Sequence, residues 1–194
     1  MSTTDTKTHG LCHHEESLLL IVDVQEKLTA VMPDKVVNRL RRNAGMLLKT
    51  ATLLGIPVIA TEQYPKGLGK LEDALTSLLP QGSSLYEKTG FSCLAAEGLS
   101  DRLVDSGRRQ IILTGVEAHI CVLQSALELN AKGHEVFVVG DAVCSRNREN
   151  YENALHRLRH TGINVIDTES VLFEWVRDSR HEHFKTVSSL VQSG

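Results

Sequence analysis

Short apolar runs alternate along the chain with longer amphipathic stretches, and this alternation predicts most of its secondary structure. The predicted strands, most of them short apolar runs, fall at residues 17–23, 56–61, 83–88, 109–115, 135–139 and 163–166. Helical spacing of apolar residues marks residues 34–54, 99–106, 119–132 and 147–160, and the chain after residue 166 is mostly helical in pattern. Gly55, Gly133 and Gly162 follow three of these stretches, as is typical of helix ends.

The predicted strands are apolar throughout and are separated by helices, which indicates a parallel sheet covered on both faces. We therefore expect an α/β fold with three α/β/α layers, Rossmann-like, built on a mainly parallel six-stranded sheet. Right-handed crossovers place all strand carboxyl ends at one edge, where ligands bind in such sheets. No repeat or linker divides the chain, so we expect one domain over residues 17–194 after a flexible extension over residues 1–16.

The composition of the chain indicates which kinds of partner and which cellular compartment to expect. The chain of 194 residues has a formal net charge of -3 and 4% aromatic residues, which argues against a nucleic-acid partner. The basic cluster at residues 39–42 is therefore interpreted as a solvated helix face. No apolar run reaches the roughly 18 residues of a membrane span. The four cysteines are widely spaced without a CxxC pair, which favours a reducing, cytoplasmic location.

Three polar residues fall at the predicted ligand edge of the sheet. Asp23 ends the first strand, Lys88 ends the third, and Cys121 opens the helix after the fourth. A helix N-terminus and a nearby lysine both favour a thiolate, and a carboxylate can carry a proton from the thiol to a leaving group. Each residue alone is more often a cap, a solvated strand end or a small core residue, so the combination carries the interpretation.

The turn before Cys121 is the most specific local signal. It reads Gly115-Val116-Glu117-Ala118-His119-Ile120-Cys121 and joins a strand to a helix at the thiol. Such a turn leaves backbone N–H groups that can bind an oxyanion.

On three segments the chain resembles the isochorismatase-like cysteine hydrolases, and the similarity runs from about residue 17 to residue 170. The three segments are Leu20-Ile21-Val22-Asp23-Val24-Gln25, Glu87-Lys88-Thr89-Gly90-Phe91-Ser92 and residues 115–122. The resemblance implies a parallel sheet flanked by helices and a catalytic set of Asp23, Lys88 and Cys121. It also implies a cis peptide bond at Val116–Glu117 and an oxyanion hole formed by the backbone N–H groups of Glu117 and Cys121.

The resemblance also separates subgroups of the family. Nicotinamidase-like members bind a metal through an Asp and two His after the second strand, but residues 61–69 contain neither residue type. True isochorismatases lack the nucleophilic cysteine that this chain has. The chain is most similar to the metal-free hydrolases that share Thr-Glu-Gln-Tyr-Pro, here residues 61–65. We therefore expect no metal or other cofactor, a small-molecule substrate, and a homo-oligomer, either a dimer or larger. The apolar positions of the last helices, at residues 171–176 and 187–191, also favour contact between subunits.

The expected reaction is hydrolysis of a C–N bond of a small amide-type compound through a thioester on Cys121. The candidates for substrate binding are polar or aromatic residues near the three motifs: Gln25, Gln63, Tyr64, Phe91 and His119. Two alternatives remain open, namely a non-catalytic or redox-sensing α/β protein with Cys121 as its reactive thiol, and a scaffold that works through assembly. A sensor thiol needs a positive neighbour but no proton-carrying carboxylate, so Asp23 discriminates between sensor and hydrolase.

Overall fold

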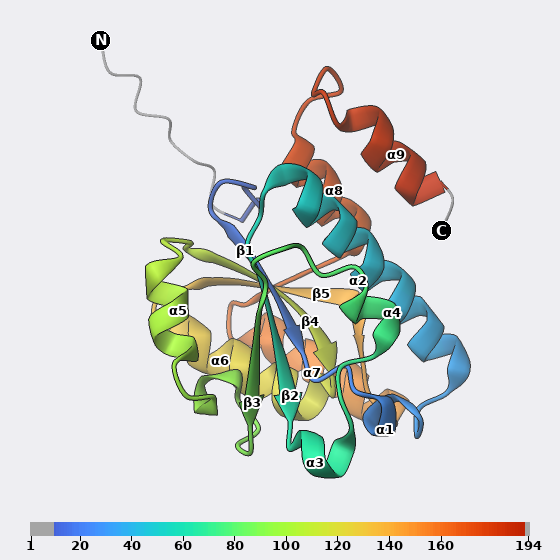
Figure 1. Ribbon diagram of the computed structural model, residues 1–194, viewed down its shortest axis with the longest axis vertical. Coiled ribbons are helices and arrows are strands. Elements are labelled where there is room, and N and C mark those ends of the chain that lie inside the picture. Colours follow the sequence, from blue (N-terminus) through green and yellow to red (C-terminus); the bar gives the residue numbers. More distant parts are fainter. Residues whose placement is uncertain (1–9, 193–194) are drawn as a thin grey trace.

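Six strands form one sheet in which every neighbouring pair runs parallel (Figure 1). The computed structural model describes residues 10–192. Its strands are β1 (Ser17–Val22), β2 (Val58–Gln63), β3 (Ser84–Lys88), β4 (Gln110–Val116), β5 (Glu135–Cys144) and β6 (Asn164–Ile166). Their order, β3-β2-β1-β4-β5-β6, confirms the predicted fold and places the switch in strand order between β1 and β4.

Helices cover both faces of the sheet (Figure 1). One face carries α2 (Asp34–Leu54), α8 (Thr168–Val176) and α9 (Phe184–Gln192), and the other carries α5 (Leu99–Asp105), α6 (Leu123–Ala131) and α7 (Arg148–His160). The shorter helices are α1 (Glu26–Thr29), α3 (Pro65–Leu68), α4 (Asp73–Thr76), η1 (Cys93–Ala95) and η2 (Ala118–Val122). The predicted helix over residues 34–54 is confirmed, and it ends where Gly55 takes the left-handed conformation.

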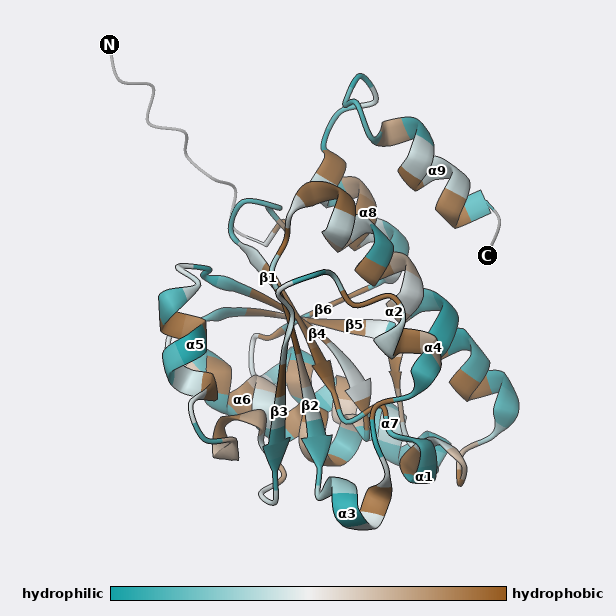
Figure 2. Cartoon of the chain, in the orientation of Figure 1, coloured by the Kyte–Doolittle hydropathy of each residue, from teal (hydrophilic) through white to brown (hydrophobic). Residues whose placement is uncertain are grey.

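The central strand β1 carries apolar side chains on both faces because each face lies in a separate core, whereas the edge strand β3 is partly exposed. In β1, Leu19 and Ile21 pack with α2 and α8, whereas Leu18 and Leu20 pack with α5 and α6. All six residues of β1 are buried. Figure 2 shows hydrophobic residues along the central strands and hydrophilic residues on the outer helices and at the ends of β2 and β3. Packing on both faces of the sheet thus fixes the positions of the residues at the carboxyl ends of its strands.

The N-terminal segment differs in part from the flexible extension expected over residues 1–16. Residues 1–9 lie outside the described residues, but residues 10–16 pack against the domain. The Cys12 side chain is buried, and its backbone N–H donates to the Glu174 carboxylate at 2.7 Å. The His13 backbone N–H donates to the Gln110 side chain at 2.7 Å. Side-chain acceptors far along the chain therefore hold this segment, which local sequence pattern could not predict.

Three other elements differ from prediction. Strand β2 begins two residues later than expected, and the loop that follows it contains α3. The single helix expected from residue 119 begins as one π-helical turn, η2, before α6. The apolar positions of the last helices, expected to serve an oligomer contact, include Val171, Trp175 and Val187, which are buried in the chain's own core. Within residues 10–192, no helix is long and apolar enough to cross a membrane.

Candidate active site

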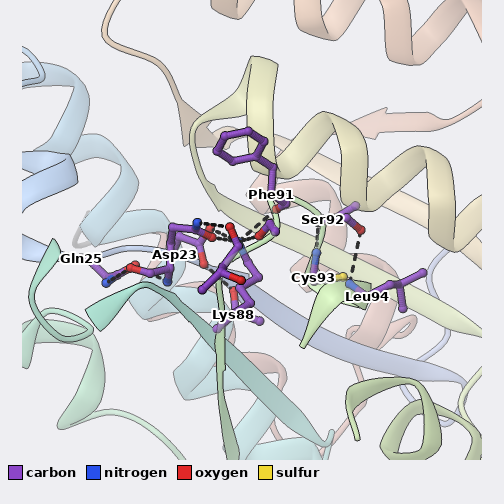
Figure 3. Close-up of polar contacts among 12 residues, drawn as sticks. Asp23, Gln25, Lys88, Phe91, Ser92, Cys93 and Leu94 are labelled. Carbon is purple, nitrogen blue, oxygen red and sulfur yellow. Dashed lines mark hydrogen bonds and ion pairs between the residues drawn. The ribbon is translucent and has the colours of Figure 1, made fainter. Parts of the chain in front are cut away.

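Asp23 lies at the carboxyl end of β1, where the strand order switches. Its side chain is fully buried, and its φ of 53° turns the chain sharply after the strand. One carboxylate oxygen accepts the Thr61 hydroxyl at 2.7 Å, and the other lies 2.6 Å from the Lys88 ammonium (Figure 3). Thr61 ends the paired part of β2 beside β1, so two neighbouring strands hold one carboxylate. Sequence reasoning gave Thr61 no such role.

Lys88 is the last residue of β3, and its side chain is also fully buried. Its Nζ faces four oxygens: Asp23 Oδ2 at 2.6 Å, Gln63 Oε1 at 2.8 Å, and the carbonyls of Phe91 at 3.0 Å and Gly90 at 3.2 Å. A buried charge is tolerated when an opposite charge and hydrogen-bond acceptors compensate it. The ammonium is therefore fixed in position and cannot move without breaking several contacts.

Cys121 completes the cluster from the η2 turn between β4 and α6. It is 6% exposed, and its thiol is hydrogen-bonded to the Asp23 carboxylate. Burial raises the pKa of Cys121 to about 12, the negative charge of Asp23 adds to this effect, and Lys88 opposes it. Lys88 lowers the pKa of Cys121, as expected, but desolvation outweighs it, so the net shift is upward. The resting group is a neutral thiol beside a carboxylate that can accept its proton.

The turn before Cys121 has the geometry that the resemblance implies. The Val116–Glu117 peptide bond is cis. The Glu117 carbonyl accepts hydrogen bonds from the backbone N–H groups of Ile120 at 3.0 Å and Val122 at 3.3 Å. A backbone hydrogen bond from Glu117 to the Cys121 sulfur favours the thiolate. The oxyanion hole expected from the N–H groups of Glu117 and Cys121 stays a prediction.

Comparison with known proteins now adds to this geometry. A sequence model described as the Isochorismatase domain matches residues 17–170. The chain belongs to the isochorismatase family.

Relatives of known sequence and structure agree with this assignment. The chain is 39% identical over 178 residues to isochorismatase domain-containing protein 2 of Danio rerio, covering 90% of this chain and 86% of that protein. The MAR1 ribonuclease of Caenorhabditis elegans superposes with a TM-score of 0.88 at 32% identity, covering 94% of this chain and 92% of that one. YcaC from Pseudomonas aeruginosa, solved with hexane-2,5-diol and covalent acrylamide, gives 0.85 at 25% identity, covering 96% and 98%. These matches support an isochorismatase-family hydrolase.

Two glutamines of this isochorismatase-family chain hold the site together. The Gln25 side chain is fully buried and donates to the carbonyls of Gln63 at 3.0 Å and Gly69 at 2.5 Å. Its own oxygen accepts the Gln63 backbone N–H at 2.6 Å. The Gln63 side chain accepts from Lys88 and donates to the Thr89 carbonyl at 2.6 Å. Both residues were expected to bind substrate, but their polar groups are already used to position the loop and the ammonium.

Tyr64 and Phe91 lie at the outside of the same cluster. Tyr64 is 55% exposed and Phe91 is 53% exposed, although both are large and apolar. The Phe91 carbonyl binds Lys88, while its ring projects away from the Asp23–Lys88 pair (Figure 3). Their expected role in substrate binding stays a prediction that their exposure permits.

The His119 side chain contacts residues that follow β5. Its Nδ1 lies 2.9 Å from the Ser145 hydroxyl, and its Nε2 lies 3.4 Å from the Asn150 amide. The neighbouring Glu117 carboxylate accepts the Arg146 backbone N–H at 3.0 Å and the Arg146 guanidinium at 3.0 Å. The turn is therefore tied to the end of β5 by side chains that no motif in the sequence marks.

No metal centre is formed by the described part of the chain. Within residues 10–192, no group of three or more His, Cys, Asp or Glu side chains is arranged to hold a metal ion. The cation that faces Asp23 is the Lys88 ammonium, at 2.6 Å.

Proposed function

We propose that the chain is a cysteine-dependent hydrolase that cleaves a C–N bond of a small amide-type compound through a thioester. One observation carries the proposal. The Asp23 carboxylate contacts the Lys88 ammonium and accepts a hydrogen bond from the Cys121 thiol, in a place where all three side chains are buried. A structural salt bridge needs no thiol, and a structural thiol needs no ion pair beside it.

The proposed reaction has two halves, the formation of a thioester on Cys121 and its hydrolysis by water. Asp23 takes the Cys121 proton as sulfur attacks the carbonyl carbon, and backbone N–H groups of the turn stabilise the oxyanion. The C–N bond then breaks, and Asp23 returns the proton to the leaving amine. In the second half, Asp23 takes a proton from water, which attacks the thioester. The C–S bond then breaks and releases the acid, and Asp23 returns the proton to the Cys121 sulfur, which restores the thiol and the carboxylate. Lys88 keeps the carboxylate oriented and offsets its charge throughout.

The raised pKa of Cys121 fits this sequence of steps. A free thiolate would be rare near neutral pH, since burial raises the pKa to about 12. Proton transfer to Asp23 during attack avoids forming that thiolate beforehand. The covalent acrylamide on the similar YcaC also supports a nucleophile in this fold, because acrylamide is an electrophile that adds to thiolates.

The decisive experiment is a panel of small amides and esters, read out as released acid. Wild type should turn over at least one compound, and Cys121→Ala should lose about 10³-fold or more in kcat/KM. Cys93→Ala is the matched control, because Cys93 is buried nearby but contacts Ser125 through its backbone. An RNA oligonucleotide belongs in the panel because the similar C. elegans protein is called a ribonuclease. Cleavage of RNA alone would contradict the amide proposal, and a reactive Cys121 without turnover would favour the redox sensor.

We also propose a homo-oligomer in a reducing, cytoplasmic compartment. Large apolar side chains remain exposed on the edge strand β3 and on α5, namely Leu85 at 50% and Val104 at 74%. All four cysteines are free thiols. Sedimentation should give a mass above 21.4 kDa at micromolar concentration, and a monomer at every concentration would contradict the assembly.

A further inference from the structure

A cavity of about 400 Å³ lies between the start of α2 and the start of α7, beside the carboxyl end of β5. It is separate from the Asp23–Lys88 pair. The charged residues that line it are three arginines and one glutamate, namely Arg39, Arg146, Arg148 and Glu152. Its apolar wall includes Pro33, Val36 and the ring of Tyr151. Its volume lies within the range of about 300–1,000 Å³ that is typical of small-molecule sites.

The charges around this cavity are not balanced. Arg148 pairs with Glu152 at 2.7 Å, and Arg146 pairs with Glu117 at 3.0 Å. Among residues 10–192, no carboxylate pairs with Arg39.

The guanidinium of Arg39 contacts a backbone carbonyl and the Tyr151 side chain. One Nη donates to the Val143 carbonyl at 3.3 Å, and the guanidinium carbon lies 5.7 Å from the centre of the Tyr151 ring. Its Nε is buried and has no hydrogen-bond partner within the described part of the chain. Buried polar groups without a partner are rare and call for an explanation such as a missing ligand. Arg39 thus brings to the cavity wall a positive charge that no carboxylate within residues 10–192 pairs with.

A guanidinium prefers planar or tetrahedral oxyanions, because its N–H groups bind two oxygens side by side. The apolar wall formed by Pro33, Val36 and Tyr151 can pack against a hydrocarbon body. We propose that this cavity binds a small organic anion, whose carboxylate or phosphate binds Arg39 and whose apolar body lies against Val36 and Tyr151. This site does not depend on the proposed hydrolase activity, because none of the three proposed catalytic residues lines it.

The cavity also shares a wall with the turn that carries Cys121. Ser145 and Arg146 line the cavity, and they contact His119 and Glu117, respectively. A bound anion competes with Glu117 for the Arg146 guanidinium. Binding should therefore change the rate at which iodoacetamide labels Cys121.

The test is calorimetric titration with three probes of similar size: benzoate, phenyl phosphate and the neutral benzyl alcohol. Wild type should bind at least one of the two anions, and the one that binds more tightly identifies the oxyanion. Arg39→Met should weaken that binding by about tenfold or more, since a hydrogen-bonded charge is lost. Arg42→Met, an exposed arginine on the same helix, is the matched control and should bind as wild type does.

Arg39→Lys separates charge from geometry, and it also covers the case in which Arg39→Met fails to fold. It keeps the charge but loses the planar fork, so its binding should fall between those of wild type and Arg39→Met. The proposal is wrong if neither anion binds, if benzyl alcohol binds as tightly as the anions, or if Arg39→Met and Arg42→Met bind equally well.

Discussion

Lys88 and Arg39 are both cations near the carboxyl edge of the sheet, but their surroundings differ. Lys88 faces four oxygens, including the Asp23 carboxylate at 2.6 Å. Arg39 faces one carbonyl and one aromatic ring, and its buried Nε has no partner among residues 10–192. The same edge of the sheet therefore carries two kinds of charge network. In the closed network the cation, Lys88, is paired with a carboxylate. In the open network the cation, Arg39, has no carboxylate partner among residues 10–192.

The proposed hydrolase activity and the proposed anion site together account for this difference. A closed network keeps both charges in fixed positions, so that a proton can move between a thiol and a carboxylate without rearrangement. An open network leaves part of its binding energy for a ligand that arrives from solution. The comparison predicts that the first cation supports the fold strongly and that the second supports it weakly.

The largest expected effect is on stability when Lys88 is removed. Lys88→Met leaves the buried Asp23 without its counter-ion, which should lower the free energy of unfolding by about 3–5 kcal/mol. Urea denaturation measures this change. Lys27→Met is the control, because Lys27 is exposed and its ammonium donates to the Gly67 carbonyl. The double variant with Asp23→Asn should recover part of the loss in stability. A loss below about 1 kcal/mol in Lys88→Met would mean that Asp23 does not need Lys88 as its counter-ion.

Asp23→Asn should separate turnover from thiol reactivity. Turnover should fall by about 10²–10⁴-fold, because an amide cannot accept the thiol proton. Iodoacetamide labelling of Cys121 should become faster, because the negative charge that raises its pKa is gone. Peptide mapping of labelled protein on a folded sample measures the second effect. Slower labelling would show that Asp23 assists the thiolate instead of opposing it.

The two cations also face different thiols, which gives a pH dependence. Burial raises the pKa of Cys93 to about 11 and those of Cys121 and Cys144 to about 12, from 9.0. Lys88 opposes the shift at Cys121, and Arg39 opposes it at Cys144. A raised pKa means that the folded state holds the proton more tightly than the unfolded state does. The thiol contribution to stability is therefore complete below about pH 9 and is lost progressively toward pH 12.

Urea midpoints measured across that range test the sign of this dependence. Cys144→Ala should make the alkaline loss of stability shallower. An unchanged slope in that variant would show that the Cys144 thiol does not stay protonated in the folded state.

A smaller effect is expected when Arg39 is removed. Arg39→Met breaks one long hydrogen bond but also removes an unsatisfied buried donor, so the free energy of unfolding should change by less than about 1 kcal/mol. Urea denaturation beside Lys88→Met compares the two cations directly. A loss as large as that of Lys88→Met would mean that Arg39 serves the fold and not a ligand.

The sequence predicted the frame of the site because its signals are local. The apolar run before Asp23 and the glycine after residue 54 mark a strand and a helix end, and the rule for parallel sheets brings Asp23 and Lys88 together. Three motifs in the expected order were enough to identify the family. The match of the Isochorismatase domain to residues 17–170 confirms that identification.

Features that depend on packing could not be predicted in the same way. The pKa of Cys121 is raised because of desolvation, which no local pattern reports. The basic cluster at residues 39–42 was interpreted as one solvated face, but its three arginines have different surroundings. Arg39 borders the cavity, Arg41 pairs with Glu72 at 2.5 Å, and Arg42 is exposed. Helical spacing gives the direction of each side chain, but the partner comes from elements far along the chain.

The smallest expected effect is that of metal removal. Asp23 already faces the Lys88 ammonium, so the charge that a metal ion would supply to this carboxylate is present in the side chain. Residues 61–69 also lack the Asp and His ligands of the nicotinamidase-like subgroup. Activity measured after chelation and dialysis should therefore equal that of the untreated enzyme. Lys88→Met is the informative partner in this experiment, because zinc or manganese should not restore its turnover. Restoration by a metal would show that the closed network needs only a positive charge at this place, and loss on chelation of wild type would show that the network is incomplete without one.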